Sequence, residues 1–140
     1  MRRLIPLHRT VPILLVVFAA ACADDLSTTV TEPTTTTTTT EVFTGTIGRN
    51  GAATHSFTTT RSGSVTASLS SLRPDRTIAV GLSLGTWNGE TCQTVIARDR
   101  AVVGNAVIGT ASSAGTLCVR VYDVGAIVVP TVYVVQVVRP

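Results

Sequence analysis

The sequence of 140 residues contains no lysine, one Trp, two Tyr and three Phe, and only 14% of its residues are charged. A nucleic-acid binder needs arginines or lysines clustered on one face. Here three of the eleven arginines lie in the first nine residues, and from Cys22 onward eight arginines are balanced by eight acids. We therefore expect no nucleic-acid partner.

The residues that are abundant favour strands. The chain has 25 Thr and 21 Val, both β-branched. Outside the first 22 residues no segment shows an apolar stripe with the 3.6-residue period of a helix. The composition therefore excludes a helical bundle, and the length suffices for one domain but not for two.

Residues 1–21 are predicted to be a signal peptide. Arg2, Arg3 and Arg9 precede an apolar run at 13–18, and small residues at 19–21 follow it. Together these two segments are about nine residues long, whereas a membrane-spanning helix needs about 20. Export with cleavage is favoured, and an uncleaved anchor is the alternative.

The segment Ala19-Ala20-Ala21-Cys22 resembles the lipobox of bacterial lipoproteins. The resemblance implies cleavage before Cys22 and acylation of that residue, so the expected membrane contact is through N-terminal acyl chains, which together give stable anchoring. Ala23 follows the cysteine in place of the Asp typical of inner-membrane lipoproteins, which favours the outer membrane. The alternative is ordinary cleavage near Ala21, which leaves Cys22 as a free thiol.

Residues 22–40 are predicted to form a disordered tether. Seven consecutive threonines occupy 34–40, and such a run cannot bury enough apolar area to offset the entropy lost on ordering. Thr-rich stretches with proline are typical of stalks, with or without O-linked sugar. The segment is expected to hold a folded domain away from the lipid surface.

Residues 41–140 alternate apolar and polar side chains with the period of two that strands require. Turn residues separate the alternating segments, including Asn88-Gly89, which is typical of tight hairpins, and a polar turn expected at 98–100. The strands are expected at about 42–47, 54–59, 65–70, 78–84, 91–97, 102–110, 115–124 and 131–138. Eight short strands at this spacing predict an all-β fold, a single antiparallel β-sandwich.

Two cysteines lie in the predicted strands. Cys92 and Cys118 both point away from the expected core, and an exported pair usually forms a disulfide. The prediction is a bridge between the outer faces of neighbouring strands. Zinc is the alternative, but His55 is the only histidine after residue 22, too few for a four-ligand site. No metal or other cofactor is expected.

The segments at 115–125 and 133–137 resemble the end of bacterial pre-peptidase C-terminal domains, and those at 43–47, 55–57 and 62–65 resemble their beginning. The resemblance covers Val42 to Pro140. It implies a jelly-roll-like sandwich that serves as an accessory module, and some members resemble carbohydrate- or collagen-binding domains. The acidic segment with which some members bind calcium is replaced here by residues 77–82, which contain no acid.

The sequence offers little for catalysis. His55 lies in a strand rich in Thr and Ser, with no nucleophile-elbow motif nearby. The acids of the folded part fall at predicted strand ends or turns, which are Glu41, Asp75, Glu90, Asp99 and Asp123. We therefore expect a protein that is not an enzyme.

Trp87 is the main candidate for ligand binding. It precedes the Asn88-Gly89 turn, where an aromatic side chain can stack on a sugar or anchor a protein contact. A polar rim is expected beside it, formed by Glu90, Arg98, Asp99 and Arg100. The alternative is that Trp87 covers one end of the sandwich.

Two other surfaces stand out. Arg120 and Tyr122 share the predicted face of Cys118, and Val132, Val134 and Val138 make the outer face of the last strand apolar. The expected function is that of a non-catalytic, lipid-anchored envelope protein with a binding module for glycan or extracellular protein. The alternative is a structural subunit of an envelope complex.

Overall fold

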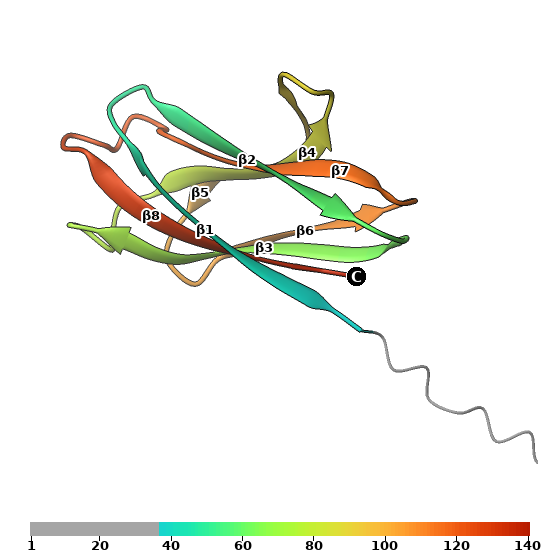
Figure 1. The fold of residues 1–140 in the computed structure, drawn as a ribbon. Helices are drawn as coiled ribbons and strands as arrows, with labels where there is room; N and C mark the ends of the chain where they lie inside the picture. Colours follow the sequence, from blue (N-terminus) through green and yellow to red (C-terminus); the bar gives the residue numbers. More distant parts are fainter. Residues whose placement is uncertain (1–36) are drawn as a thin grey trace, which may run out of the picture. The chain divides into compact units, whose positions relative to one another are not determined.

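A computed structural model describes residues 37–140, and this part of the chain consists of strands and loops (Figure 1). The strands are β1 (Thr39–Ile47), β2 (Ala52–Thr59), β3 (Gly63–Arg73), β4 (Val80–Trp87), β5 (Cys92–Ala101), β6 (Ala106–Ala111), β7 (Gly115–Tyr122) and β8 (Thr131–Arg139). The predicted signal peptide, Cys22 and the tether as far as residue 36 lie outside the described residues. Within the described part, no helix is long and apolar enough to cross a bilayer.

Two four-stranded antiparallel sheets form a sandwich. One sheet has the order β1-β8-β3-β6 and the other β2-β7-β4-β5. The chain changes sheet at every connection except the hairpin between β4 and β5, which gives the jelly-roll arrangement. The predicted fold class, an all-β antiparallel sandwich of eight strands, is confirmed.

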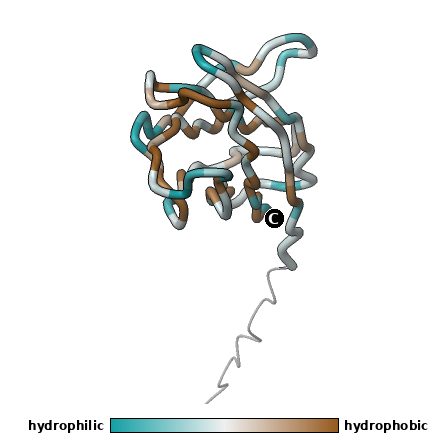
Figure 2. The backbone as a smooth tube through the Cα atoms, turned by 90° about the vertical axis from the view of Figure 1, so that its left-hand side faces the viewer, coloured by the Kyte–Doolittle hydropathy of each residue, from teal (hydrophilic) through white to brown (hydrophobic). Residues whose placement is uncertain are grey.

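The alternation seen in the sequence places the core between the sheets. In β8, Tyr133, Val135 and Val137 are fully buried, whereas Val132 and Gln136, which alternate with them, are exposed and Val134 is half-buried. Figure 2 shows hydrophobic stretches along the strands and hydrophilic residues mainly in the turns. Burial of these β-branched and aliphatic side chains is the main source of stability for such a sandwich.

Strand β5 differs from the prediction. The residues expected to form a turn, 98–100, lie within the strand, and the chain turns at 102–105 instead. The side chain of Asn105 helps to close that turn, since its Oδ1 accepts a hydrogen bond of 3.3 Å from the backbone N–H of Val102. Because β5 is an edge strand with solvent beside it, it tolerates charged side chains that a central strand would not.

Strand β1 begins earlier than the sequence indicated. It starts at Thr39, and Thr39 pairs with Arg139 at the end of β8. The last two residues of the segment assigned to the tether, Thr39 and Thr40, therefore belong to the sandwich. Threonine suits a strand as well as it suits a stalk, so composition alone did not separate the two.

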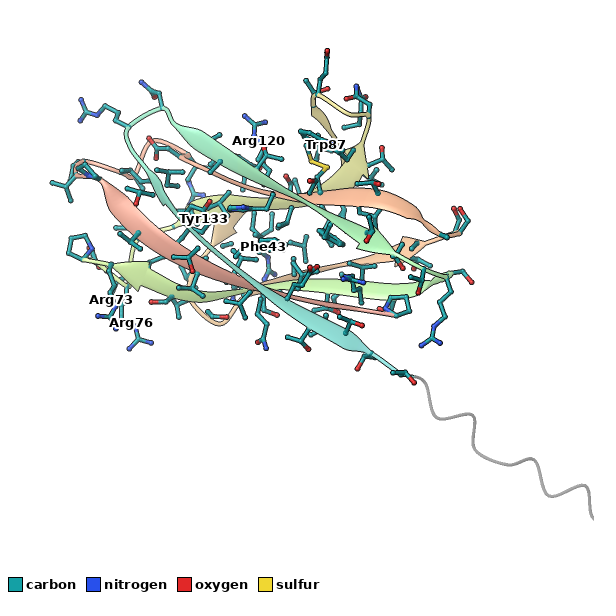
Figure 3. All side chains as sticks on the ribbon, viewed as in Figure 1. Phe43, Arg73, Arg76, Trp87, Arg120 and Tyr133 are labelled. Carbon is teal, nitrogen blue, oxygen red and sulfur yellow. A yellow bond between two sulfur atoms is a disulfide. The ribbon has the colours of Figure 1, made fainter. Side chains whose placement is uncertain are left out.

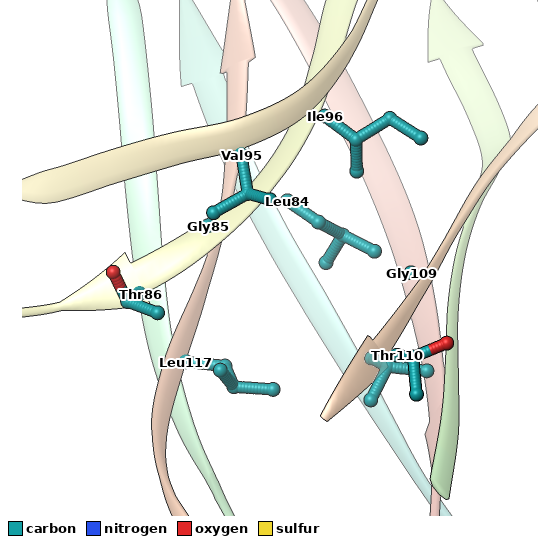
Figure 4. Close-up of a pocket in the computed structure, with 9 residues that line it drawn as sticks. Leu84, Gly85, Thr86, Val95, Ile96, Gly109, Thr110 and Leu117 are labelled. Atoms are coloured by element: carbon teal, nitrogen blue, oxygen red, sulfur yellow. The ribbon is translucent and has the colours of Figure 1, made fainter. Parts of the chain in front are cut away.

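The sheets leave a small apolar cavity of about 70 Å³ between β5 and β6. Figure 4 shows Leu84, Ile96 and Leu117 around it, with Gly109 on the opposite sheet. A methyl group on Gly109 would lie 3.8 Å from the nearest atoms, which is ordinary packing distance. This edge of the sandwich is therefore less completely filled than its centre.

Candidate ligand-binding site

The turn between β4 and β5 is organised by Asn88. Its Oδ1 accepts hydrogen bonds from the backbone N–H groups of Glu90 (3.0 Å) and Thr91 (2.8 Å), and its Nδ2 donates to Thr91 Oγ1 (3.0 Å). Gly89 follows with a φ of 105°, which glycine adopts without strain. The chain turns where the Asn88-Gly89 pair predicted, over the four residues 88–91, and the Asn88 side chain is occupied in building this turn.

The hairpin folds over the outer face of its own sheet. Gly85 is paired with Cys118, and a β-carbon on Gly85 would lie only 2.1 Å from the carbonyl oxygen of Gln93. The pairing of β4 with β5 is irregular at the same place, between Leu84 and Gly85. A glycine at this position therefore allows β5 to approach closely, and Figure 1 shows the hairpin rising from the sheet.

A disulfide between Cys92 and Cys118, with a Cα–Cα distance of 5.8 Å, ties the hairpin to β7. The predicted disulfide is confirmed. The expectation that its strands are neighbours was wrong, because β4 lies between β5 and β7. The hairpin folds over β4 at Gly85 and so brings Cys92 to Cys118 on the far side of β4, which sequence alone does not reveal.

The folded-over hairpin and the sheet enclose a cleft of about 370 Å³. Figure 3 shows Trp87 and Arg120 on this side of the molecule, with the disulfide beside Trp87. Trp87 is half-buried and Arg120 is exposed. The lining residues come from the hairpin and from β2 and β7, and they are Ala52, Thr54, Trp87, Glu90, Thr91, Cys92 and Arg120.

Tyr122 holds Arg120 over the outer face of the sheet. The Arg120 guanidinium lies 5.5 Å from the centre of the Tyr122 ring, a cation–π distance. The ring itself lies across Gly81, where an added β-carbon would be 2.1 Å from ring atoms. The Tyr122 hydroxyl donates a hydrogen bond to the Asp99 carboxylate. Burial, followed by this hydrogen bond and the charge of Asp99, raises the pKa of Tyr122 to about 12.

No protein-family model and no curated protein matches this sequence.

The structure places the five predicted ligand-binding residues in three different settings. Trp87 and Glu90 line the cleft, and Asn88 forms the turn above it. Arg98 and Arg100 do not line it, because they lie farther along β5, where Arg98 pairs with Leu82. The polar rim expected from these two arginines is therefore absent from the cleft.

The basic group beside Trp87 is Arg120, and Thr54 adds a hydroxyl from the neighbouring strand. The sequence placed Arg120 on the face of Cys118, but it did not show that Trp87 lies above that face. The predicted disulfide was the sequence signal that could have linked Trp87 to Arg120. Cys92 is five residues from Trp87 in the same hairpin, and Cys118 is two residues from Arg120.

His55 takes part in a contact between the two sheets. Its Nε2 lies 2.7 Å from the hydroxyl of Tyr133, and its ring stacks on Phe43 with 4.9 Å between ring centres. Gly45 leaves space for the Tyr133 hydroxyl, since a β-carbon there would lie 2.3 Å from it. Burial lowers the pKa of His55 and raises the pKa of Tyr133. The two groups therefore form a hydrogen bond between neutral side chains, in which the tautomer of the imidazole sets the donor and the acceptor.

Asp123 organises the loop that leads from β7 to β8. Its Oδ1 accepts hydrogen bonds of 2.8–3.0 Å from the backbone N–H groups of residues 125–127, and its Oδ2 accepts one of 2.8 Å from Asn50. These bonds lower the pKa of the carboxyl group, and the bond from Asn50 has the largest effect.

Among residues 37–140, no three His, Cys, Asp or Glu side chains are grouped as metal ligands would be.

Proposed function

We propose that this chain is an exported, lipid-anchored protein of the bacterial cell envelope that displays a non-catalytic binding module. In this proposal residues 1–21 direct export, Cys22 carries the acyl chains, and the tether presents the sandwich in the manner of a stand-alone pre-peptidase C-terminal-like domain. The membrane that anchors the protein in this proposal is the outer membrane.

The observation that carries the binding function is the cleft between Trp87 and Arg120. It combines an aromatic face with a cation, the carboxylate of Glu90 and the hydroxyls of Thr54 and Thr91. Binding sites typically pair an apolar surface with a few well-placed polar groups in this way. The disulfide fixes the hairpin before a ligand arrives, so that less entropy is lost on binding.

A glycan suits these groups best. The Trp87 ring offers a flat apolar face for the C–H side of a sugar, and the surrounding donors and acceptors match sugar hydroxyls. A volume of about 370 Å³ is at the small end of the range for ligand sites, which suits one or two sugar units rather than a large ligand. An extracellular protein that inserts one side chain beside Trp87 is the other candidate ligand.

A second candidate function rests on the opposite sheet. The outer face of the β1-β8-β3-β6 sheet exposes aliphatic side chains with few charges among them. Val42 and Ile108 are each 61% exposed, and Val132 is 41% exposed. Val42 lies on one edge strand and Ile108 on the other, so these side chains offer a partner protein apolar contacts across the sheet face. This arrangement favours a role as a structural subunit of an envelope complex.

Cross-linking in living cells distinguishes the two functions. A photoreactive amino acid is introduced at Thr91, beside the cleft, or at Val42, on the apolar face, with Ser112 in an exposed turn as the control position. Capture of one glycan or protein from Thr91 alone supports the binding module, and capture from Val42 alone supports the structural subunit. Equal capture from Ser112 would contradict both.

The anchoring part is tested separately by the mass of the N-terminal peptide. The proposal expects a mature chain that begins at an acylated Cys22. A chain that begins with an unmodified Cys22, or that retains residues 1–21, would contradict it.

A further inference from the structure

A second cleft lies where β3 ends and β8 begins. It is lined by Ser71, Arg73, Pro74, Arg76, Pro130 and Val132, and its volume is about 710 Å³. Arg73 is the last residue of β3 and pairs with Val132, so its side chain lies on the outer face of the β1-β8-β3-β6 sheet. Figure 3 shows Arg73 and Arg76 side by side and far from Trp87.

The lining contains two cations and no acid. Within residues 37–140 the one ion pair joins Arg139 to Glu41, so neither Arg73 nor Arg76 is neutralised by a carboxylate of the described part. Asp75 lies between them in the sequence, but its Oδ1 accepts hydrogen bonds from the backbone and the hydroxyl of Thr77, at 2.8 and 2.7 Å. Both guanidinium groups are therefore available to an anion from solution.

The remaining wall indicates more than a simple ion. Two prolines and a valine line the cleft together with the arginines and add apolar surface, and a volume of about 710 Å³ is large enough for an organic ligand. Guanidinium groups bind carboxylates and phosphates through paired hydrogen bonds. The ligand that fits has a C–H-rich skeleton that carries negative groups.

We propose that this cleft, defined by Arg73 and Arg76, binds anionic sugar units, in which a carboxylate or phosphate meets the arginines and the ring packs on Pro74, Pro130 and Val132. A nucleic-acid strand fits less well, because proteins bind unpaired bases by stacking them on aromatic side chains and the lining has none. The site is independent of the Trp87 cleft, which lies on the other sheet, so either can exist without the other.

The test measures binding of two acidic probes to the purified full-length protein by calorimetry. Trigalacturonate carries carboxylates and maltotriose phosphate carries a phosphate; the methyl ester of the first and unmodified maltotriose are their neutral counterparts. We expect at least one acidic probe to bind and the neutral ones to bind at least about tenfold more weakly. The tighter acidic probe then identifies the anionic group.

Three variants locate the site. Arg73→Gln and Arg76→Gln should each weaken binding by about tenfold or more, since each removes a charged donor. Arg61→Gln is the matched control, because Arg61 is exposed just before the opposite end of β3, about 30 Å away along the strand. Its affinity should equal that of the unchanged protein, and all three melting temperatures should agree.

A measurement on the unchanged protein covers the case in which a variant fails to fold. Trigalacturonate or maltotriose phosphate, whichever binds, should protect Arg73 and Arg76, but not Arg61, from phenylglyoxal, as read by peptide mass. The proposal is overturned if neither acidic probe binds, if Arg61→Gln loses as much affinity as the other two, or if a single-stranded DNA of equal charge binds as tightly.

Discussion

Removal of the disulfide should destabilise the whole sandwich and release the hairpin. The bridge closes a segment with a sequence separation of 26 residues between Cys92 and Cys118. For a loop of this length, the loss of closure entropy from the unfolded chain corresponds to about 3.5 kcal/mol. In a domain of this size that equals a fall in melting temperature of roughly 14–28 °C.

The assay compares the Cys92→Ala/Cys118→Ala double variant with the unchanged protein in guanidinium chloride. Circular dichroism reports the unfolding of the strands, and the fluorescence of Trp87, the only tryptophan, reports the hairpin. We expect a lower midpoint by both probes and a red-shifted Trp87 emission in the folded variant, because the half-buried ring becomes more accessible to water when the hairpin is no longer tied down.

Reductant provides the control for the two substitutions. Cys118 is fully buried, so its replacement by alanine also removes packing. Reduction of the unchanged protein breaks the cross-link without removing either sulfur, and it should reproduce most of the loss, whereas the double variant should not respond. An unaltered midpoint for both the variant and the reduced protein would refute the reasoning.

Three further predictions concern other parts of the sandwich. Gly45→Ala forces a methyl group to within 2.3 Å of the Tyr133 hydroxyl and should cost about 1–3 kcal/mol in chemical unfolding, whereas Gly48→Ala, with no atom within 4 Å, should cost much less. Because the pKa of His55 is lowered in the folded state, stability should fall as the pH drops below 6.5, and His55→Gln should flatten that dependence in unfolding midpoints measured from pH 7.5 to 5. Gly109→Ala, which meets its nearest neighbours at 3.8 Å, should leave the melting temperature unchanged or raise it by a few degrees, and a clear fall would show that the cavity is already filled.

Much of the fold could be predicted because the strands follow a simple alternation. The sequence indicated eight strands, the Asn88-Gly89 turn and the disulfide, and the structure has all three. Strand ends were harder to place. Thr39 and Thr40 belong to a threonine run that fits a stalk and a strand equally well, and only pairing with β8 decides between them.

The candidate site could be predicted only in part, because its residues meet through the order of the strands. Trp87 and Glu90 were identified from the turn beside them. The arginine that joins them is Arg120, which is at least 30 residues away from both. It comes close only because β4 and β7 are neighbours and the hairpin folds back over Gly85. Arg98 is nearer in sequence, but β5 carries it away from the turn.

The central claim is that the cleft between Trp87 and Arg120 binds a ligand, and the fluorescence of Trp87 tests it most directly. Soluble fragments of envelope glycan, and the species captured by the cross-linker at Thr91, are titrated into the full-length protein and into Arg120→Gln, with Arg61→Gln as the control. The account predicts a saturable change in emission, an affinity about tenfold or more weaker in Arg120→Gln and an unaltered one in Arg61→Gln. No change in emission with any of them, or equal affinity in Arg120→Gln, would contradict it.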